Sequence, residues 1–255
     1  MSVLGYLQSK ASSAVLSPAE QDSITTSINT ISARLDAYFG NNISRHFRFG
    51  SSTRGTILPR AYDLKSDIDY MVVFSETGYQ PQTYLNKLKS FADYYYSNSN
   101  IKQSSPTIVL ELNHIKFDLV PALPGFFDEY KIPNAELGWV GTSPNDFNQV
   151  LTEANRSSND NLKPAIRLIK MWNASKGYVF DSYVLERHCA QQIFIFCNNL
   201  KSYFYSLIDS LPDYLGTQWR TNAVTRAKQL VREARSYEDF GDYQSAERKI
   251  AQLIS

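Results

Sequence analysis

Two aspartates one residue apart open the stretch of the chain most suited to chemistry. Asp67 and Asp69 run directly into an apolar segment, Tyr70 to Phe74. Residues i and i+2 of a strand point to the same face, so the two carboxylates project together if the strand conformation reaches back to Asp67. Close carboxylates repel one another and are costly to bury unpaired, and a divalent cation removes both penalties. The pair therefore predicts a cation site at a strand end.

A third carboxylate, Asp118, interrupts a second apolar stretch, Phe117 to Val120. If this strand lies beside the first, Asp118 joins the pair. Oxygen ligands favour Mg²⁺ or Mn²⁺ over zinc. Three carboxylates can hold two such ions, which is the arrangement used for in-line phosphoryl or nucleotidyl transfer. Asp118 is also placed to take the proton of an attacking hydroxyl.

A glycine-serine turn precedes the aspartates. Gly50 to Ser52 follows a predicted short strand, Arg45 to Phe49. Glycine lets the backbone approach a ligand closely, and exposed amides of such a turn can bind an anion, with the Ser51 hydroxyl as a further donor. Arg54 and Arg60 come next and either contact phosphate or lie in solvent. An Asp-x-Asp pair alone is also typical of a solvated turn, but the turn, the pair and the later aspartate together favour a metal-phosphate site.

A basic stripe on a predicted helix, Leu162 to Ser175, gives a second candidate for anion binding. At about 100° per residue, Lys163, Arg167 and Lys170 lie on one stripe beside the apolar face. Such a stripe is usually a solvated surface. Its border with the apolar face favours a contact with a triphosphate, and Lys170 is the first candidate for that contact.

The elements that must position these groups divide the chain into two halves. The first half is predicted to hold two helices, one from Ser17 to near Gly40 and one over Tyr84 to Tyr96. Its predicted strands are Arg45 to Phe49, Asp69 to Phe74, Thr107 to Asn113 and Ile115 to Val120. Pro121 is expected to end the last strand, and residues 124 to 160 are expected to form a long connection. The second half is predicted to be helical, over Leu162 to Ser175, Ser182 to Leu207, Asn222 to Ser236 and Tyr243 to Ile254. A cleft between two such lobes is the usual place for a ligand.

The bulk composition is ordinary for a soluble globular protein. The 255 residues are 43% hydrophobic and 20% charged, with a net charge of +1, so any anion site must be local. The N-terminus lacks the features of a signal peptide and no apolar run is long enough to span a bilayer. Cys189 and Cys197 are expected in one helix, too far apart to bridge, which fits a reducing cytoplasm.

These motifs together resemble the nucleotidyltransferase superfamily that shares the polymerase-β-type palm. Within it, Leu162 to Asn173, followed by Asp181 to Glu186, resembles the bacterial CD-NTases, relatives of oligoadenylate synthetase and cyclic GMP-AMP synthase. The resemblance covers roughly residues 17 to 205. It implies an α+β fold with a palm (a mixed sheet with helices) over residues 1–155, a helical lobe over residues 156–255, and an active site in the cleft between them.

The resemblance also implies roles for individual residues. Asp67, Asp69 and Asp118 would be the catalytic carboxylates and hold two Mg²⁺ or Mn²⁺ ions. Gly50 and Ser51 would bind the donor phosphates. The remaining candidates for nucleotide binding are Lys170 and Ser182, which close on the triphosphate, Tyr183, which stacks on the donor base, and the basic residues Arg54 and Lys163.

The implied activity is nucleotidyl transfer that joins nucleoside triphosphates into a small cyclic or linear oligonucleotide. This product would be a second messenger that activates a separately encoded effector protein in anti-phage defence (CBASS). No membrane and no obligatory nucleic acid are expected as partners. The chain is short for this family, and residues 246 to 255 lack both an aromatic-glycine closing segment and a terminal glycine, so conjugation of the C-terminus is not expected. No zinc insertion is visible, so direct sensing of double-stranded DNA is not expected.

Two alternatives belong to other classes. A template-independent nucleotidyltransferase acting on an RNA 3′ end, such as a tRNA, would use the basic stretch Trp219 to Arg235 to hold a phosphate backbone, although the near-neutral net charge argues against a large RNA footprint. A catalytically inactive palm could serve as a nucleotide-binding module. The presence of all three aspartates and of Ser51 argues against it.

Overall fold

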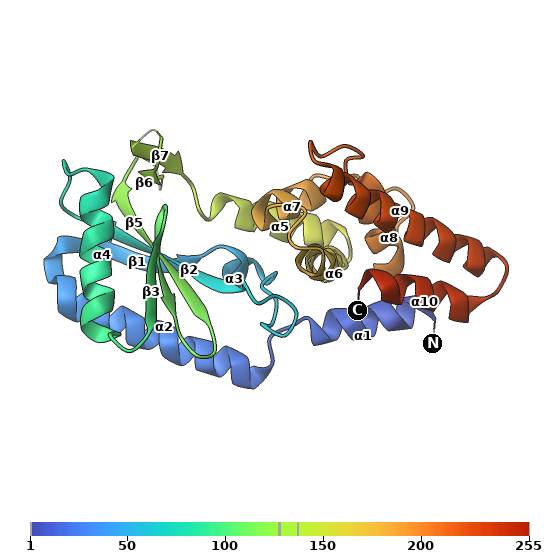
Figure 1. The fold of residues 1–255 in the computed structure, drawn as a ribbon, viewed down its shortest axis with the longest axis horizontal. Helices are drawn as coiled ribbons and strands as arrows, with labels where there is room; N and C mark the ends of the chain where they lie inside the picture. Colours follow the sequence, from blue (N-terminus) through green and yellow to red (C-terminus); the bar gives the residue numbers. More distant parts are fainter. Residues whose placement is uncertain (1, 127–128, 137, 255) are drawn as a thin grey trace. The chain divides into compact units, whose positions relative to one another are not determined.

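A mixed sheet forms the core of the first half of the chain in the computed structural model (Figure 1). The structure describes residues 2–126, 129–136 and 138–254. The strands within these residues are β1 (Ile43–Phe49), β2 (Asp67–Phe74), β3 (Asn100–Ser104), β4 (Thr107–Glu111), β5 (Lys116–Pro124), β6 (Tyr130–Asn134) and β7 (Gly138–Thr142). Their order is β1-β2-β5-β4-β3, and β6 pairs with both β5 and β7.

Strand β2 lies between an antiparallel neighbour, β1, and a parallel neighbour, β5. Because side chains alternate along a strand, Asp67 and Asp69 share a face with Met71 and Val73. The last two residues belong to a buried cluster on that face, together with Tyr130 of β6. The carboxylates therefore lie on the same face of the sheet as this buried cluster, next to it at the N-terminal end of β2.

Two helices pack against the sheet: α2 (Pro18–Phe39) contacts β1, and α4 (Pro81–Tyr95) contacts β3, β4, β5 and β6. The ring of Phe74 lies 5.3 Å from the ring of Phe39 and 5.1 Å from that of Tyr84, measured between centroids. Buried aromatic pairs at such separations contribute beyond their buried area. These ring contacts anchor the C-terminal end of β2, the strand that begins with Asp67 and Asp69.

Helices make up most of the rest of the chain (Figure 1). They are α1 (Val3–Ser13), α3 (Ser51–Arg54), α5 (Asp146–Ser157), α6 (Leu162–Ser175), α7 (Ser182–Ala190), α8 (Leu200–Ser210), α9 (Gln218–Asp239) and α10 (Tyr243–Leu253). The expectation of an α+β protein is confirmed. The predicted start of α2 is confirmed in detail, because the Glu20 amide donates to the Ser17 hydroxyl (3.3 Å) and the Ser17 amide donates to the Glu20 carboxylate (2.8 Å).

Three predictions about residues 124 to 207 are wrong. Residues 124 to 160 are not a connection, because β6, β7 and α5 lie within them. The helix predicted over 182 to 207 is two helices, α7 and α8, since Asn199 and Ser202 form a capping box that starts α8. Cys189 is buried in α7 and Cys197 lies between the helices, so they do not share a helix, and both are free thiols.

The prediction that Pro121 ends its strand is also wrong. Strand β5 continues to Pro124, and Pro121 is in register with Val72 of β2. Proline removes a backbone donor, which excludes it from most central strands. Strand β4 pairs with β5 only as far as Leu119. Beyond that residue β4 offers no partner, so the N–H that Pro121 lacks costs no hydrogen bond to β4.

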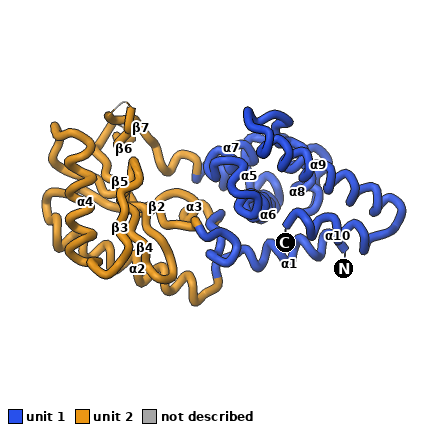
Figure 2. The backbone as a smooth tube through the Cα atoms, viewed as in Figure 1, with its two compact units in different colours: residues 1–16, 56–64, 148–255 blue, residues 17–55, 65–147 orange. Residues whose placement is uncertain are grey.

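The chain divides into two compact units (Figure 2). Unit 1 contains Met1–Leu16, Thr56–Leu64 and Asn148–Ser255, and unit 2 contains Ser17–Gly55 and Lys65–Phe147. Unit 2 holds the sheet, and unit 1 is mainly helical. The units are discontinuous in sequence, whereas the predicted division into residues 1–155 and 156–255 is continuous and stays a prediction. Among the described residues, no helix combines the length and the apolar character needed to cross a membrane.

Candidate active site

Four charged side chains meet at one end of β2 and β5 in unit 2. The parallel register places Asp67 opposite Lys116 and Asp69 opposite Asp118. Asp67 and Asp69 are two positions apart on β2, and Lys116 and Asp118 are two positions apart on β5. All four side chains therefore project from the same face of the sheet. The Lys116 ammonium lies 3.1 Å from the Asp67 carboxylate and 3.4 Å from that of Asp118. The three predicted catalytic carboxylates are thus neighbours, with a lysine among them.

Asp69 is the most buried of the three carboxylates, and its surroundings disfavour its charge. Burial is the main cause, and the charges of Asp67 and Asp118 add to it, so the pKa of Asp69 rises to about 7. The cations of Arg54 and Lys116 oppose this rise in the pKa. A carboxyl group with this pKa needs a positive partner before it is fully ionised at neutral pH.

Asp118 shows the same need. Burial, followed by the charge of Asp67, raises the pKa of Asp118 above its usual value. The neighbouring Lys116 opposes this rise in the pKa. Asp118 Oδ1 is buried and lies 3.4 Å from the Lys116 ammonium, and within the described part of the chain it has no hydrogen bond of good geometry. A buried oxygen without a hydrogen-bond partner marks a position where a ligand would be stabilised.

Gly50 is fitted closely against the buried carboxylate. Its φ of +75° lies in the left-handed region, which favours glycine. A Cβ at this position would lie 1.9 Å from Asp69 Oδ2, far inside van der Waals contact. The site therefore requires glycine both for the backbone conformation and for the space that Asp69 occupies.

The predicted phosphate-binding turn is a one-turn helix, α3. The Gly50 carbonyl accepts hydrogen bonds from the amides of Thr53 (3.1 Å) and Arg54 (3.3 Å). The hydroxyls of Ser52 and Thr53 bond to backbone carbonyls of the same turn, whereas no hydrogen bond of the Ser51 hydroxyl is found in the described part of the chain. Ser51 is thus the hydroxyl of this turn that remains for a ligand.

Arg54 also belongs to this corner of unit 2. Its side chain is buried, and its guanidinium lies 5.4 Å from the centroid of the Phe147 ring. Its charge is close enough to lower the pKa of Asp69. The predicted phosphate contact of Arg54 stays a prediction, and its observed setting is a cation beside the carboxylates.

The residues at this corner fit a hard divalent cation by type. The donors are carboxylate oxygens, one of them without a hydrogen bond, and the side chains of Asp67 and Asp118 are 28% and 19% exposed. Within residues 2–126, 129–136 and 138–254, however, no three acidic, imidazole or thiol groups are gathered at metal-binding separations. The ammonium of Lys116 bridges two of the three carboxylates instead.

The first candidate for a triphosphate contact, Lys170, is buried in unit 1. Its side chain is 5% exposed, and its ammonium donates to Glu186 Oε1 (2.7 Å) and to the Thr56 carbonyl (2.9 Å). The Thr56 hydroxyl donates to the same Glu186 oxygen (2.9 Å). Lys170 thus ties α6, α7 and the segment after Gly55 together. Sequence reasoning gave Glu186 no role, although it shares a helical face with buried Leu185 and Cys189.

The other candidates for nucleotide binding in unit 1 lie on α6 and α7. The cap of α7 is Asp181, whose carboxylate accepts from the Val184 amide (3.0 Å), so Ser182 is the first residue of the helix. Tyr183 is 45% exposed, with the Arg187 guanidinium 5.9 Å from its ring centroid. Lys163 is half-buried at the start of α6. The carboxylates belong to unit 2, so a joint site of both groups stays a prediction.

Part of the basic stretch on α9 is neutralised within the protein. Lys228 pairs with Asp213 (2.7 Å) and Arg235 pairs with Asp209 (2.5 Å). Surface cations that already have acidic partners contribute little to binding a phosphate backbone. This pairing weakens the interpretation of α9 as an RNA-binding helix.

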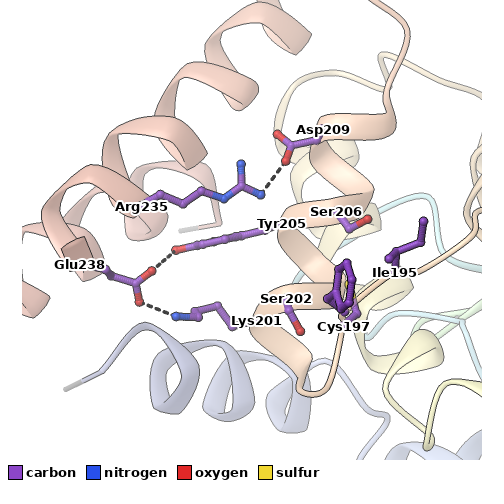
Figure 3. Close-up of a pocket in the computed structure, with 10 residues that line it drawn as sticks. Ile195, Cys197, Lys201, Ser202, Tyr205, Ser206, Asp209, Arg235 and Glu238 are labelled. Atoms are coloured by element: carbon purple, nitrogen blue, oxygen red, sulfur yellow. Dashed lines mark hydrogen bonds and ion pairs between the residues drawn. The ribbon is translucent and has the colours of Figure 1, made fainter.

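A cavity of about 410 Å³ lies in unit 1 between α8, α9 and the segment that joins α7 to α8 (Figure 3). The ring of Tyr205 crosses it, and its hydroxyl lies 3.5 Å from Glu238. The volume is within the range of small-molecule sites. Both cations at its wall are already paired, Lys201 with Glu238 (2.8 Å) and Arg235 with Asp209 (2.5 Å). The cavity therefore shows no unmet charge that would define a ligand.

The fold places the chain among proteins with a polymerase-β-like nucleotidyltransferase architecture. A structure of Vibrio cholerae DncV with 3′-deoxy GTP bound matches with a TM-score of 0.74 at 10% identity, covering 96% of this chain and 91% of that chain. The Bradyrhizobium diazoefficiens CD-NTase CdnG, in complex with GTP, matches with a TM-score of 0.72 at 13% identity, covering 99% and 97%. At these identities the likeness shows the fold.

The sequence narrows the class to a family. The family model "Second Messenger Oligonucleotide or Dinucleotide Synthetase domain" (SMODS) matches residues 1–155, more than half of the chain, and the chain belongs to this family. A probable cyclic nucleotide synthase of Bacillus cereus is 29% identical over 111 residues, which are 40% of this chain. The match spans about a third (34%) of the length of that relative. The resemblance to the bacterial CD-NTases is confirmed.

Proposed function

We propose that the protein is a metal-dependent nucleotidyltransferase that joins nucleoside triphosphates into a cyclic or linear oligonucleotide second messenger. One observation carries this proposal: two parallel strands bring Asp67, Asp69 and Asp118 to one face, beside a glycine whose Cβ would overlap a carboxylate. Family membership supplies the reaction class, and the burial of two of these carboxylates explains why they would take up a cation.

The carboxylates would hold two Mg²⁺ or Mn²⁺ ions, which supply Lewis-acid activation of the attacking hydroxyl and neutralise charge on the departing pyrophosphate. Asp118, with its pKa raised by burial, is suited to accept the proton of the attacking ribose hydroxyl. Gly50 leaves the backbone of α3 open to the donor phosphates, and the Ser51 hydroxyl can donate to them. Nucleotidyl transfer by this route needs no covalent intermediate on the protein.

Residues of unit 1 would complete the nucleotide site. We assign Lys170 and Ser182 to the triphosphate, Tyr183 to stacking on the donor base, and Arg54 of unit 2 with Lys163 to further phosphate contacts. The exposed ring of Tyr183 supports its role, because a base can stack only on an open face. Lys170 would have to exchange at least part of its contact with Glu186 for a phosphate oxygen.

Family membership also supports a proposal for the substrates and the cellular setting. Structures of similar proteins contain ATP, in E. coli CdnC, and GTP, in CdnG, so nucleoside triphosphates are the proposed substrates. The product would activate a separately encoded effector protein in cytoplasmic anti-phage signalling (CBASS). No membrane and no obligatory nucleic acid take part in this scheme.

Product analysis tests the proposed activity. The purified protein is incubated with Mg²⁺ or Mn²⁺ and all four ribonucleoside triphosphates, and products that resist phosphatase are identified by mass spectrometry. The expected result is a small oligonucleotide that is absent with the Asp67→Ala/Asp69→Ala variant. A product that persists in the variant would contradict the proposed roles of these residues.

A transferase acting on an RNA 3′ end is the second candidate, and the same assay separates it from the first. Addition of total RNA would then be required for incorporation of labelled nucleotide, and the label would appear in long RNA. The internal pairing of Lys228 and Arg235 on α9 makes this outcome the less expected one.

A further inference from the structure

Lys116 is a charged residue at the carboxylate corner for which the proposed function has no task. It is the first residue of β5, two positions before Asp118 and in register with Asp67. A lysine at the start of a strand usually extends into solvent, because its long stem carries the ammonium outward. Here the side chain is only 22% exposed. Its position therefore needs a reason other than solubility.

The contacts of Lys116 supply that reason. Its ammonium lies 3.1 Å from Asp67 Oδ2 and 3.4 Å from Asp118 Oδ1, so one cation serves two carboxylates on different strands. Burial lowers the pKa of Lys116, but the charges of Asp67 and Asp118 outweigh it, and the net pKa is raised. The contact of one ammonium with both carboxylates is thus electrostatically favourable.

Electrostatics explains why the corner needs such a cation before a metal arrives. Three carboxylates at neighbouring positions of two strands repel one another, and the desolvation of Asp69 and Asp118 adds to that penalty. Removing one member of a buried charge cluster leaves the others uncompensated. A lysine that reaches two of the carboxylates provides the compensation without any ligand.

The same contacts exclude a metal ion. A divalent cation binds carboxylate oxygens at roughly 2.0–2.2 Å when it is Mg²⁺, and its charge repels an ammonium that contacts the same oxygens. The Lys116 ammonium is in contact with both Asp67 and Asp118, so it occupies the side of these oxygens that a metal ion would share.

We propose that Lys116 is a built-in counter-ion, which holds Asp67 and Asp118 in the metal-free protein and must leave them when a divalent cation binds. The proposal rests on the metal site of the proposed function. Lys116 is a positioning residue in this scheme. It keeps the carboxylates in place between turnovers. It also makes their affinity for Mg²⁺ and Mn²⁺ lower than that of three carboxylates without a neighbouring cation. The protein would then bind a divalent cation more readily when the cation arrives in complex with a nucleoside triphosphate.

Direct Mn²⁺ binding tests the proposal, independently of any product. Binding to the full chain is measured without nucleotide by calorimetry or by the paramagnetic resonance of free Mn²⁺. Lys116→Met keeps the length of the side chain and removes its charge. We expect the variant to bind Mn²⁺ about tenfold more tightly than the wild type, because the competing cation is gone. Its melting temperature in EDTA should fall, and the rise on adding Mn²⁺ should be larger than in the wild type.

Two further variants define the comparison. Lys89→Met removes a lysine that also pairs with an aspartate, Asp93 (2.7 Å), but on the surface of α4; it should leave Mn²⁺ affinity unchanged. Lys116→Arg retains a charge and should bind Mn²⁺ within about twofold of the wild type. The arginine variant also provides a test if the methionine variant does not fold, since tenfold tighter binding by it would overturn the proposal.

The outcomes separate this proposal from the proposed function. Tighter Mn²⁺ binding by folded Lys116→Met supports the counter-ion role. Unchanged or weaker binding by this folded variant, with a wild type that binds Mn²⁺, overturns the role of Lys116 and leaves the metal site standing. No Mn²⁺ binding by the wild type or by the variant, with or without ATP, overturns the metal site itself.

Discussion

Replacing Asp69 by asparagine should stabilise the metal-free protein while abolishing its activity. The pKa of Asp69 is about 7, against an ordinary value of 3.8, and this difference corresponds to on the order of 4 kcal/mol for holding the ionised form in the fold. Solvent screens part of that penalty, because the side chains of Asp67 and Asp118 are 28% and 19% exposed. We therefore expect Asp69→Asn to raise the free energy of unfolding by about 2 kcal/mol at pH 8 in EDTA.

The pH dependence follows from the direction of the shift in pKa. Between about 3.8 and about 7, the folded protein binds a proton at Asp69 that the unfolded chain has released. The wild type should therefore lose stability as the pH rises through this window, and the loss should level off above pH 7. The advantage of Asp69→Asn should be less than half as large at pH 5 as at pH 8, because the wild-type carboxyl is still mostly protonated there.

Urea unfolding followed by circular dichroism at both pH values measures these differences. Asp93→Asn serves as the matched control, because Asp93 is an exposed carboxylate paired with Lys89 on α4, and its replacement should change stability by no more than about 0.5 kcal/mol. Addition of Mg²⁺ and ATP should stabilise the wild type and not Asp69→Asn. A less stable Asp69→Asn protein at pH 8, or an equal gain at both pH values, would refute the electrostatic account of this corner.

Three further substitutions test other parts of the site. Gly50→Ala should reduce product formation by roughly a hundredfold in the nucleotidyl-transfer assay, since its Cβ would overlap Asp69; wild-type activity would show that the turn can shift freely. Lys170→Met should lower the free energy of unfolding in urea by on the order of 3 kcal/mol, because it leaves the Glu186 charge uncompensated. The double variant Lys170→Met/Glu186→Gln should recover part of that stability, and an equal loss in the single and double variants would contradict a buried ion pair. Tyr183→Leu should raise KM for the donor nucleotide about tenfold with an unchanged melting temperature, and an unchanged KM would remove Tyr183 from the nucleotide site.

The carboxylate corner could be predicted from the sequence because it depends on local rules. Alternation along a strand places Asp67 and Asp69 on one face wherever that strand lies. The position of Asp118 required only that the two apolar strands be neighbours, which β2 and β5 are. The start of α2 was equally local, since a capping box is a contact between residues three apart.

What could not be predicted depends on pairs of residues far apart in the chain. Pro121 is tolerated within β5 because β4 does not extend alongside it. The sequence of β5 alone does not predict how far its neighbour extends. Lys116 looks like a solvated strand end until the register sets it opposite Asp67. Glu186 lies on the buried face of α7, but only the fold shows that Lys170 and Thr56 are its partners. The break between α7 and α8 had a local signal, the capping box at Asn199, which the continuous helical periodicity obscured.

Diffraction from crystals grown with Mn²⁺ and a non-hydrolysable nucleoside triphosphate tests the central claim most directly. Anomalous scattering locates each manganese ion without reference to activity. The account predicts manganese bound by Asp67, Asp69 and Asp118, the triphosphate at Gly50 and Ser51, and the Lys116 ammonium withdrawn from both of its carboxylates. Manganese bound elsewhere, or carboxylates still bridged by Lys116 with the nucleotide in place, would contradict it.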